Sequence, residues 1–208
     1  MSADIAPPPG AIPPRQARSR AALERLLTAA QEVLTTQGFD EFTIAAVAER
    51  AGISVGGVYR RFTGKDQLVH AVIDRTFDDL QTTLAEALSA PAPDIAGVVS
   101  AFTYGFADYL ERIGPLYSAI LNAPRPPDRH ETGMAAIMDV QRRFFDAALP
   151  HTAEITRPSP SAALSTAMRT ILGTGVHRAA AAPWWPDGLT WNQWAEEMTA
   201  MTTAYLTA

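Results

Sequence analysis

Residues 43–62, TIAAVAERAGISVGGVYRRF, carry the pattern that decides the fold of this chain. Ile44 and Val47 recur at helical spacing and predict the apolar face of a short helix. Gly52 stands where that helix should end, because glycine readily adopts the left-handed conformation of a helix C-cap. Ser54 can then cap a second short helix. The stretch therefore predicts two helices joined by a tight turn, which is the layout of a helix-turn-helix that reads the DNA major groove.

The second helix of this motif has an unusual surface. Gly56 and Gly57 each cost a helix about 1 kcal/mol relative to alanine. A helix that must bring its backbone close to a partner can still use them, because glycine has no side chain that holds the partner away. Several side chains that can donate to phosphate oxygens follow, namely Tyr59, Arg60, Arg61 and Lys65. The alternative interpretation is a helical hairpin whose charged groups are merely solvated.

Residues 20–68 resemble the DNA-binding domain of the TetR family of transcriptional regulators. The matching residues are Ala29, Ala30, Gly38, Phe39, Thr43, Ile44, Val47, Ala48, Ala51, Gly52, Ile53, Ser54, Gly56, Val58, Tyr59, Phe62, Lys65 and Leu68. Two features depart from the family pattern: the second glycine, Gly57, and the pair Arg60-Arg61 before Phe62, where the family often has histidine or tyrosine. The resemblance implies an all-α fold of about nine helices. A three-helix head with the helix-turn-helix is joined by a long fourth helix to a ligand-binding and dimerisation domain.

The DNA-binding residues that we expect combine this resemblance with side-chain chemistry. They are Arg18, Thr43, Ser54, Val55, Gly56, Gly57, Tyr59, Arg60 and Lys65. We expect Val55 to make an apolar contact, such as one with a thymine methyl group. Ser54, Tyr59, Arg60 and Lys65 are expected to hold phosphates. Thr43 is also a good N-cap for the first helix of the motif. By resemblance, Arg18 belongs to a basic arm that lies along the DNA; a solvated tail is the alternative.

The charge distribution supports a nucleic-acid partner, although the net charge of the whole chain is −5. Residues 15–65 carry eight basic and five acidic side chains, whereas residues 66–208 carry nine and sixteen. A basic head on an acidic body suits a protein that offers one end to DNA. The chain has no cysteine and no apolar run near the roughly 20 residues that span a bilayer. Its first residues lack a signal-peptide core, so we expect a cytoplasmic protein.

The order of elements gives the expected domains. Residues 1–14 are proline-rich and expected to be disordered, residues 15–66 form the DNA-binding domain, and residues 67–208 form the effector-binding and dimerisation domain. Beyond the motif, apolar periodicity and proline or glycine breaks predict helices over about 19–37, 65–89, 94–113, 115–122, 129–149, 161–182 and 190–208. A stiff loop is expected at 123–128.

Two surfaces of the body are candidates for partners. The last two helices resemble the family's dimer interface, and the residues that we assign to it are Ala167, Thr170, Trp191, Trp194, Met198, Met201 and Tyr205. From Trp191 onward these residues are spaced 3, 4, 3 and 4, which is typical of a packed helical seam. The alternative is that this seam packs only within its own subunit. A twofold dimer would also match a palindromic operator with half-sites about 34 Å apart.

The second candidate surface is an effector pocket, which the family typically holds between body helices. Its expected lining is Phe102, Phe106, Tyr109, Tyr117, Met134, Met138, Phe145 and His177. The methionines and phenylalanines of residues 129–149 are expected to point inward. The alternative is that these aromatic and methionine side chains are ordinary core, since core helices show the same spacing. The sequence favours a homodimeric repressor of a palindromic operator, released when a small, largely apolar effector moves the fourth helix.

Other function classes have weaker support. The four histidines, His70, His130, His151 and His177, are scattered and lack the further ligands of a defined metal site. Catalytic motifs such as G-x-S-x-G and G-x-x-x-x-G-K are absent from the sequence. We therefore expect no enzyme activity, no metal and no cofactor. An activator and a helical interaction module without DNA binding stay open as alternatives.

Overall fold

The computed structural model describes residues 15–122, 130–182 and 184–208, and every regular element within them is helical. The helices are α1 (Arg15–Glu41), α2 (Ile44–Ala51), α3 (Val55–Tyr59), α4 (Lys65–Ala87), α5 (Ile95–Asn122), α6 (His130–Ala148), the 3₁₀ helix η2 (Leu149–Glu154), α7 (Pro160–Ala181) and α8 (Trp191–Thr207). The predicted all-α fold is confirmed. The expected disordered tail and the stiff loop at 123–128 lie outside the described residues.

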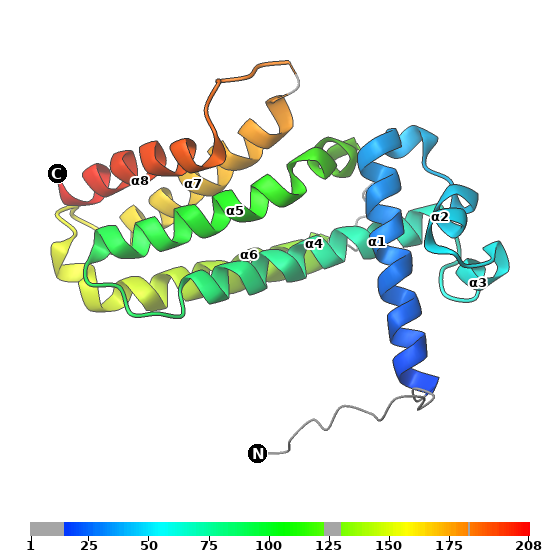
Figure 1. The fold of residues 1–208 in the computed structure, drawn as a ribbon. Helices are drawn as coiled ribbons and strands as arrows, with labels where there is room; N and C mark the ends of the chain where they lie inside the picture. Colours follow the sequence, from blue (N-terminus) through cyan, green and yellow to red (C-terminus); the bar gives the residue numbers. More distant parts are fainter. Residues whose placement is uncertain (1–14, 123–129, 183) are drawn as a thin grey trace, which may run out of the picture.

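The head consists of α1, α2, α3 and the start of α4, which share one buried cluster (Figure 1). The helical course of α1 is interrupted at Gly38, which has φ 75° and ψ 180° and so uses the positive φ that glycine tolerates. Phe42 is buried in the cluster of the head, and Phe39 packs against it. The helix begins at Arg15, so the residues expected to form an arm from Arg15 to Arg20 are the first turns of α1.

One long helix, α5, replaces the two helices predicted over 94–113 and 115–122. Pro115 lies inside α5, although proline usually ends or kinks a helix because it lacks an N–H donor. The residue after it, Leu116, is fully buried in the cluster of the head, while Leu110 and Ile113 are buried in the body. Burial of Leu116 stabilises the helical conformation beyond Pro115. The predicted break of the helix at Gly114-Pro115 is therefore wrong.

The long helix α4 joins the head to the body. Its first turns bury Leu68 and Val72 in the head, and its last turns bury Leu80 and Leu84 in the body. Midway, the Tyr109 hydroxyl of α5 donates to the Thr76 carbonyl oxygen at 3.0 Å. Burial raises the pKa of Tyr109 well above its usual value, so the hydroxyl stays a neutral donor.

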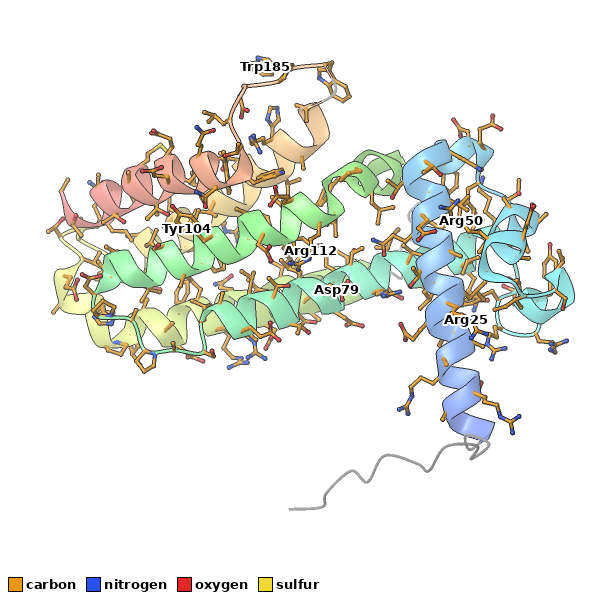
Figure 2. All side chains as sticks on the ribbon, viewed as in Figure 1. Arg25, Arg50, Asp79, Tyr104, Arg112 and Trp185 are labelled. Atoms are coloured by element: carbon orange, nitrogen blue, oxygen red, sulfur yellow. The ribbon has the colours of Figure 1, made fainter. Side chains whose placement is uncertain are left out.

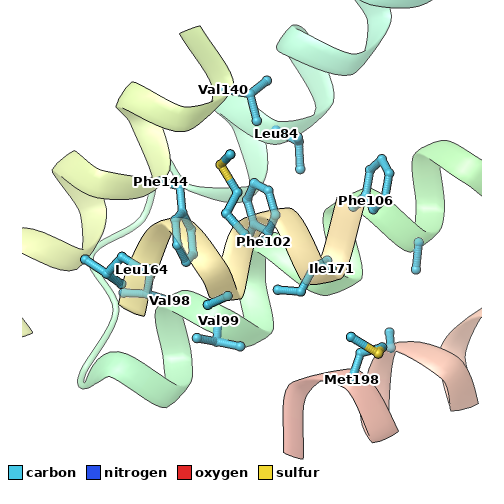
Figure 3. Close-up of a cluster of buried hydrophobic side chains, with 14 of the residues drawn as sticks. Leu84, Val98, Val99, Phe102, Phe106, Val140, Phe144, Leu164, Ile171 and Met198 are labelled. Carbon is cyan, nitrogen blue, oxygen red and sulfur yellow. The ribbon is translucent and has the colours of Figure 1, made fainter. Parts of the chain in front are cut away.

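The core of the body lies where α5 meets α4, α6, α7 and α8 (Figure 3). Phe102 and Phe144 are fully buried, with ring centroids 4.8 Å apart. Val99, Ile171 and Met198 close the cluster from α5, α7 and α8. The helices approach closely at Gly175, where an added Cβ would lie 2.7 Å from the Phe106 ring. Gly175 of α7 therefore serves packing within the subunit.

The two C-terminal helices have well-defined ends. Thr190 and Gln193 form a capping box at the start of α8, with Thr190 accepting from the Gln193 N–H at 3.2 Å. At the other end, the Thr156 N–H donates to the Leu206 carbonyl oxygen at 3.0 Å. Among the described residues, none of the helices has the length and apolar character needed to cross a membrane.

Candidate nucleic-acid interface

The helix-turn-helix forms as its sequence predicts. Thr43 Oγ1 accepts from the Ala46 N–H at 3.1 Å, which caps α2. Gly52 ends α2 with φ 64°, and the next N–H, that of Ile53, donates to the Ala48 carbonyl oxygen at 2.9 Å. This is the left-handed helix ending that glycine makes possible. The two helices are thus held at a defined angle by local hydrogen bonds.

The N-terminus of α3 is capped by Ser54, whose Oγ accepts from the Gly57 N–H at 3.1 Å. Val58 is buried beneath α3 and fixes it to the head. Val55 is 43% exposed and Tyr59 55% exposed. These two side chains, together with exposed Gly56 and Arg60, form the outward surface of α3. It can enter a groove without unfolding any part of the head.

The two glycines of α3 differ in their surroundings. A Cβ added at Gly56 would meet nothing within 4 Å, so its lack of a side chain leaves the outer surface open. A Cβ added at Gly57 would lie 2.7 Å from Ile53 Cγ2, and Gly57 is buried. Packing inside the motif thus supplies a reason for Gly57 that the sequence interpretation missed. Its contact with DNA stays a prediction.

Lys65 connects two parts of the head. Its Nζ donates to the Phe39 carbonyl oxygen at 2.6 Å and lies 4.1 Å from the centroid of the Phe39 ring. The side chain therefore joins the start of α4 to the end of α1. An ammonium group has three donors, so it can bind a phosphate beside this internal bond. Its predicted role at a DNA phosphate stays a prediction.

Hydrogen bonds and an ion pair also hold α1 against the helix-turn-helix. The Arg61 guanidinium donates to the Ser19 carbonyl oxygen at 3.2 Å and to Ser19 Oγ at 3.0 Å. Arg50 of α2 pairs with Glu32 of α1, and Figure 2 shows Arg50 beside α1. Arg18 is exposed on the first turns of α1. The sequence did not indicate that Arg61 would hold α1, because its partner lies 42 positions away.

The residues expected to line an effector pocket are spread over different surroundings. Phe102, Phe106 and Tyr109 are buried in the body core, and Tyr117 and Phe145 are half-buried against it. His177 is exposed and lies against the Trp185 ring, with ring centroids 5.9 Å apart. The structure thus brings five of these residues to one core, while His177 lies at the end of α7.

The inward orientation that the sequence predicts for Met134 and Met138 is wrong. They are 61% and 63% exposed. The buried side of α6 is instead formed by Ala136, Val140, Phe144 and Ala148, which recur every four residues. Residues offset by two from this series lie on the opposite side of a helix. The apolar residues of α6 occupy both sides, and the sequence pattern did not distinguish them.

A surface groove of about 620 Å³ lies between α4 and α6. Its lining includes Asp78 and Glu86 of α4 with Asp139 and Arg143 of α6. Hydrogen bonds from Arg143 and Arg142 lower the pKa of Asp139 to about 2, so this carboxylate stays charged at neutral pH. None of the residues predicted to line the effector pocket lines this groove.

The seam predicted on α8 is divided between the core and the surface. Trp194 and Met198 are buried against α5 and α7, and Ala167 of α7 is buried with them. Trp191, Tyr205 and Thr170 are half-buried, and Met201 is 52% exposed. For the buried residues, packing within the subunit is therefore the correct interpretation. The outward sides of α7 and α8 remain available to a second subunit.

A family model described as bacterial regulatory proteins, tetR family, matches residues 26–72. The chain is 31% identical over 96 residues to the HTH-type transcriptional activator FasR of Mycolicibacterium smegmatis, which covers 46% of this chain and 43% of FasR. It is 38% identical over 50 residues to the HTH-type transcriptional regulator SrpR of Pseudomonas putida, which covers 24% of each chain. The chain thus spans less than half the length of the curated relatives that it matches.

Solved structures extend the similarity to most of the chain. The transcriptional regulator FadR from Bacillus subtilis, in complex with stearoyl-CoA, superposes with a TM-score of 0.70 at 12% identity and covers 88% of this chain and 98% of FadR. A tetR-family transcriptional regulator from Streptomyces coelicolor superposes with a TM-score of 0.66 at 22% identity. The match covers 89% of this chain and 80% of the Streptomyces protein. At these identities the structures establish the fold alone. Residues 26–72 of this chain thus match the TetR family of bacterial regulatory proteins, and the described residues have the fold of these solved structures.

Proposed function

We propose that this chain is a cytoplasmic transcriptional regulator that binds a palindromic DNA operator as a homodimer. In our proposal it represses transcription and is released by a small, largely apolar effector. The observation that carries the proposal is the capped helix-turn-helix, which presents Val55, Tyr59 and Arg60 on an exposed side of α3. The net charge of +3 on residues 15–65 favours the same partner, because phosphate neutralisation dominates DNA affinity.

The side chains of α3 have different proposed roles. Val55 has no polar atom and fits an apolar contact with a base edge, such as a thymine methyl group. Tyr59 and Arg60 can donate to phosphate oxygens, which fixes the register without reading sequence. The Ser54 hydroxyl already accepts a bond from Gly57, but its own hydrogen can still be donated to a phosphate.

A homodimer is proposed because one short recognition helix contacts few base pairs. A twofold dimer contacts two half-sites about one helical turn, roughly 34 Å, apart. We place the dimer contact on α7 and α8, because Met201 of α8 is exposed and Trp191 of α8 is only half-buried. In this proposal the buried Trp194 and Met198 support the interface from within each subunit.

The proposed effector acts on the packing between α4 and α5. FadR from Bacillus subtilis, which shares this fold, was determined in complex with stearoyl-CoA. Long-chain acyl-CoA is therefore the first effector that we propose to test, because its acyl chain supplies the apolar group, although its CoA part is charged. Phe102, Phe106 and Tyr109 of α5 are buried here, so an acyl chain must displace the helices that cover them, including α4. A coupling of about 1–3 kcal/mol would change operator affinity roughly 5- to 150-fold.

The test begins with selection of bound sequences from random duplex DNA at near-physiological salt. We expect a palindrome with half-sites about one helical turn apart. On that operator, Arg60→Ala should weaken binding to all sequences and reduce the salt slope by about 1, because it removes a phosphate contact. Val55→Ala should instead relax base preference at one position of each half-site. Arg142→Ala, which removes a positive charge from the body, is the matched control and should leave the salt slope unchanged.

The outcomes separate the remaining functions. Failure of the folded protein to enrich any sequence, with and without acyl-CoA, would favour the interaction module. Release of the operator by stearoyl-CoA, but not by CoA alone, would support the proposed effector class. FasR is named an activator, so a reporter placed behind the selected operator decides the direction of control. Increased expression on deletion of the gene is expected for a repressor.

A further inference from the structure

The loop between α7 and α8 exposes two neighbouring tryptophans. Trp184 is 74% exposed and Trp185 71% exposed, more than any other large hydrophobic side chain in the described residues. Single exposed apolar residues are common on protein surfaces, but two exposed indoles next to each other in sequence need an explanation. Tryptophan is enriched in interfaces, where its large ring contributes much contact area at a small entropy cost. The proposed DNA and effector contacts leave this pair without a role.

The loop is held in place before any partner binds. Arg178 of α7 makes two hydrogen bonds to Asp187, at 2.7 and 3.1 Å, and a third to the Leu189 carbonyl oxygen. The Arg178 guanidinium also lies 4.1 Å from the centroid of the Trp191 ring. Its hydrogen bonds lower the pKa of Asp187, so the ion pair is intact at neutral pH.

The backbone near the tryptophans is also anchored. The N–H groups of Trp184 and Trp185 donate to the Ala181 carbonyl oxygen at 3.0 and 2.8 Å. The Trp185 ring makes an edge contact with His177. Two exposed rings on a fixed loop lose little freedom when they are covered, which is the property of a preformed binding surface.

The position of the loop indicates what can cover it. In Figures 1 and 2 the loop rises above the layer of α7 and α8, on the side away from α4 and α6. Met201 of α8 is exposed, and so is Gly173 of α7, where an added Cβ would meet nothing within 4 Å. An indole ring can lie flat against such a position because no side chain intervenes.

The charge distribution favours a second copy of this chain as the partner. Residues 66–208 carry a net charge of −7, but residues 160–208 contribute only −1 of it. Two acidic bodies repel least where their charge is lowest. This segment also exposes both signs, Arg169 on α7 and Glu196 with Glu197 on α8. A twofold arrangement that places α7 of one copy against α8 of the other brings opposite charges together.

We propose that Trp184 and Trp185 of each subunit form a clasp that closes over α7 of a second copy, around Gly173. The inference rests on the homodimer of the proposed function and adds to it a named contact outside the helices themselves. The contact is isologous, so each dimer contains the clasp twice and each substitution acts twice. Arg178 is a positioning residue, because it holds the loop through Asp187 and Leu189 without touching the partner.

The test is the dimer dissociation constant, measured by sedimentation velocity over a dilution series of the full chain without DNA. Trp184→Ala with Trp185→Ala should raise this constant by about 30-fold or more, because truncation of buried aromatic anchors gives the largest losses at interfaces. Leu149→Ala, which truncates a similarly exposed side chain on η2, is the matched control and should change nothing. Thermal unfolding by circular dichroism should be similar for all three proteins at a concentration where each is monomeric.

A second set of variants tests the positioning role of Arg178. Arg178→Ala should raise the dimer dissociation constant less than the double tryptophan variant does, because the rings remain but their loop is loosened.

Acrylamide quenching of tryptophan fluorescence supplies a readout that a purely structural role would not move. Quenching of the wild type should rise on dilution below the dimer constant. In Trp184→Phe with Trp185→Phe most of this rise should disappear, and only the contribution of Trp191, which lies on the proposed α8 contact, should remain.

The possible outcomes are distinct. A wild type that dimerises and a double tryptophan variant that dimerises equally well would overturn the clasp and leave the homodimer proposal standing. The loop would then be a surface for a different protein. A wild type that stays monomeric at every concentration, with and without operator DNA, would overturn both proposals. Selective loss of dimer in the tryptophan variants, with the Leu149 control unaffected, is the result that supports the clasp.

Discussion

At the scale of single residues, Gly56 and Gly57 show how neighbours of one type acquire different roles. Gly56 is exposed with open space around its Cα, whereas Gly57 is buried against Ile53. The Ile53 side chain is β-branched and stiff, so it cannot move aside cheaply. Only the tertiary position of the turn distinguishes the two glycines.

We expect Gly57→Ala to destabilise the head by about 1–3 kcal/mol, because the added methyl group overpacks against Ile53. Gly56→Ala should be neutral or stabilising by up to about 1 kcal/mol, since alanine is the better helix former and has room. Urea unfolding followed by circular dichroism measures both. Equal effects of the two substitutions would contradict the packing explanation.

Lys65 is a second residue whose role depends on its surroundings. Lys65→Met keeps the apolar stem but removes the ammonium that bonds Phe39 and faces its ring. We expect the DNA-free protein to lose about 1–2 kcal/mol of unfolding free energy. A role confined to phosphate binding would leave the DNA-free stability unchanged and weaken operator binding alone.

At the scale of elements, α4 and α5 form the frame that joins head and body. Each runs from one buried cluster to the other, α4 through Leu68 and Leu84 and α5 through Leu116 and Phe102. The Tyr109 hydroxyl ties the two helices together at Thr76. Our proposed function requires α4 to move. This movement must either break the hydrogen bond between Tyr109 and Thr76 or move α5 together with α4.

Tyr109→Phe should cost about 0.5–1.5 kcal/mol, the usual contribution of a buried hydrogen bond. The pKa of Tyr109 is raised in the folded state, so its contribution is fully present below the unfolded value of 10.0 and is lost as pH rises above it. Stability measured between about pH 9 and 11 should consequently fall less steeply in Tyr109→Phe than in the wild type. Identical slopes would mean that Tyr109 ionises as freely in the folded chain as in the unfolded one.

At the scale of the whole molecule, the buried cluster of the head includes side chains from beyond residue 66. Three of them, Leu68, Val69 and Val72, lie on α4. Leu116 belongs to α5 but lies inside the cluster of α1, α2 and α4. The head therefore does not complete its core from residues 15–66 alone, although the sequence places a domain boundary there. Stability of the DNA-binding surface depends on a residue some fifty positions beyond that boundary.

Leu116→Ala should destabilise the protein by about 2–5 kcal/mol. The loss should appear as faster hydrogen exchange in α1 and α2, because those helices line the cavity that remains. Leu110→Ala, a leucine on the same helix buried in the body, is the matched control and should accelerate exchange in α7 and α8 first. Protection of α1 and α2 that is unaffected by Leu116→Ala would show that the head is independent of α5.

The sequence alone predicted the helix-turn-helix and the caps at Thr43 and Ser54, and its family resemblance predicted the all-α class. These depend on residues within about four positions of one another, where spacing, glycine conformation and side-chain capping act locally. It also predicted α4 as the connector, because a helix of that length exceeds what the head can bury.

Only the tertiary structure decided which apolar residues meet. Periodicity did not place Met134 and Met138 outside, because α6 has apolar residues on two sides and packing selects one of them. Periodicity also did not predict that α5 continues past Pro115, because this continuation depends on the burial of Leu116 against helices distant in sequence. The anchored loop with Trp184 and Trp185 likewise depends on Arg178, nine positions from Asp187 and on another element. Long-range contacts of this kind have no signature in local spacing, and they determine the surfaces from which we infer function.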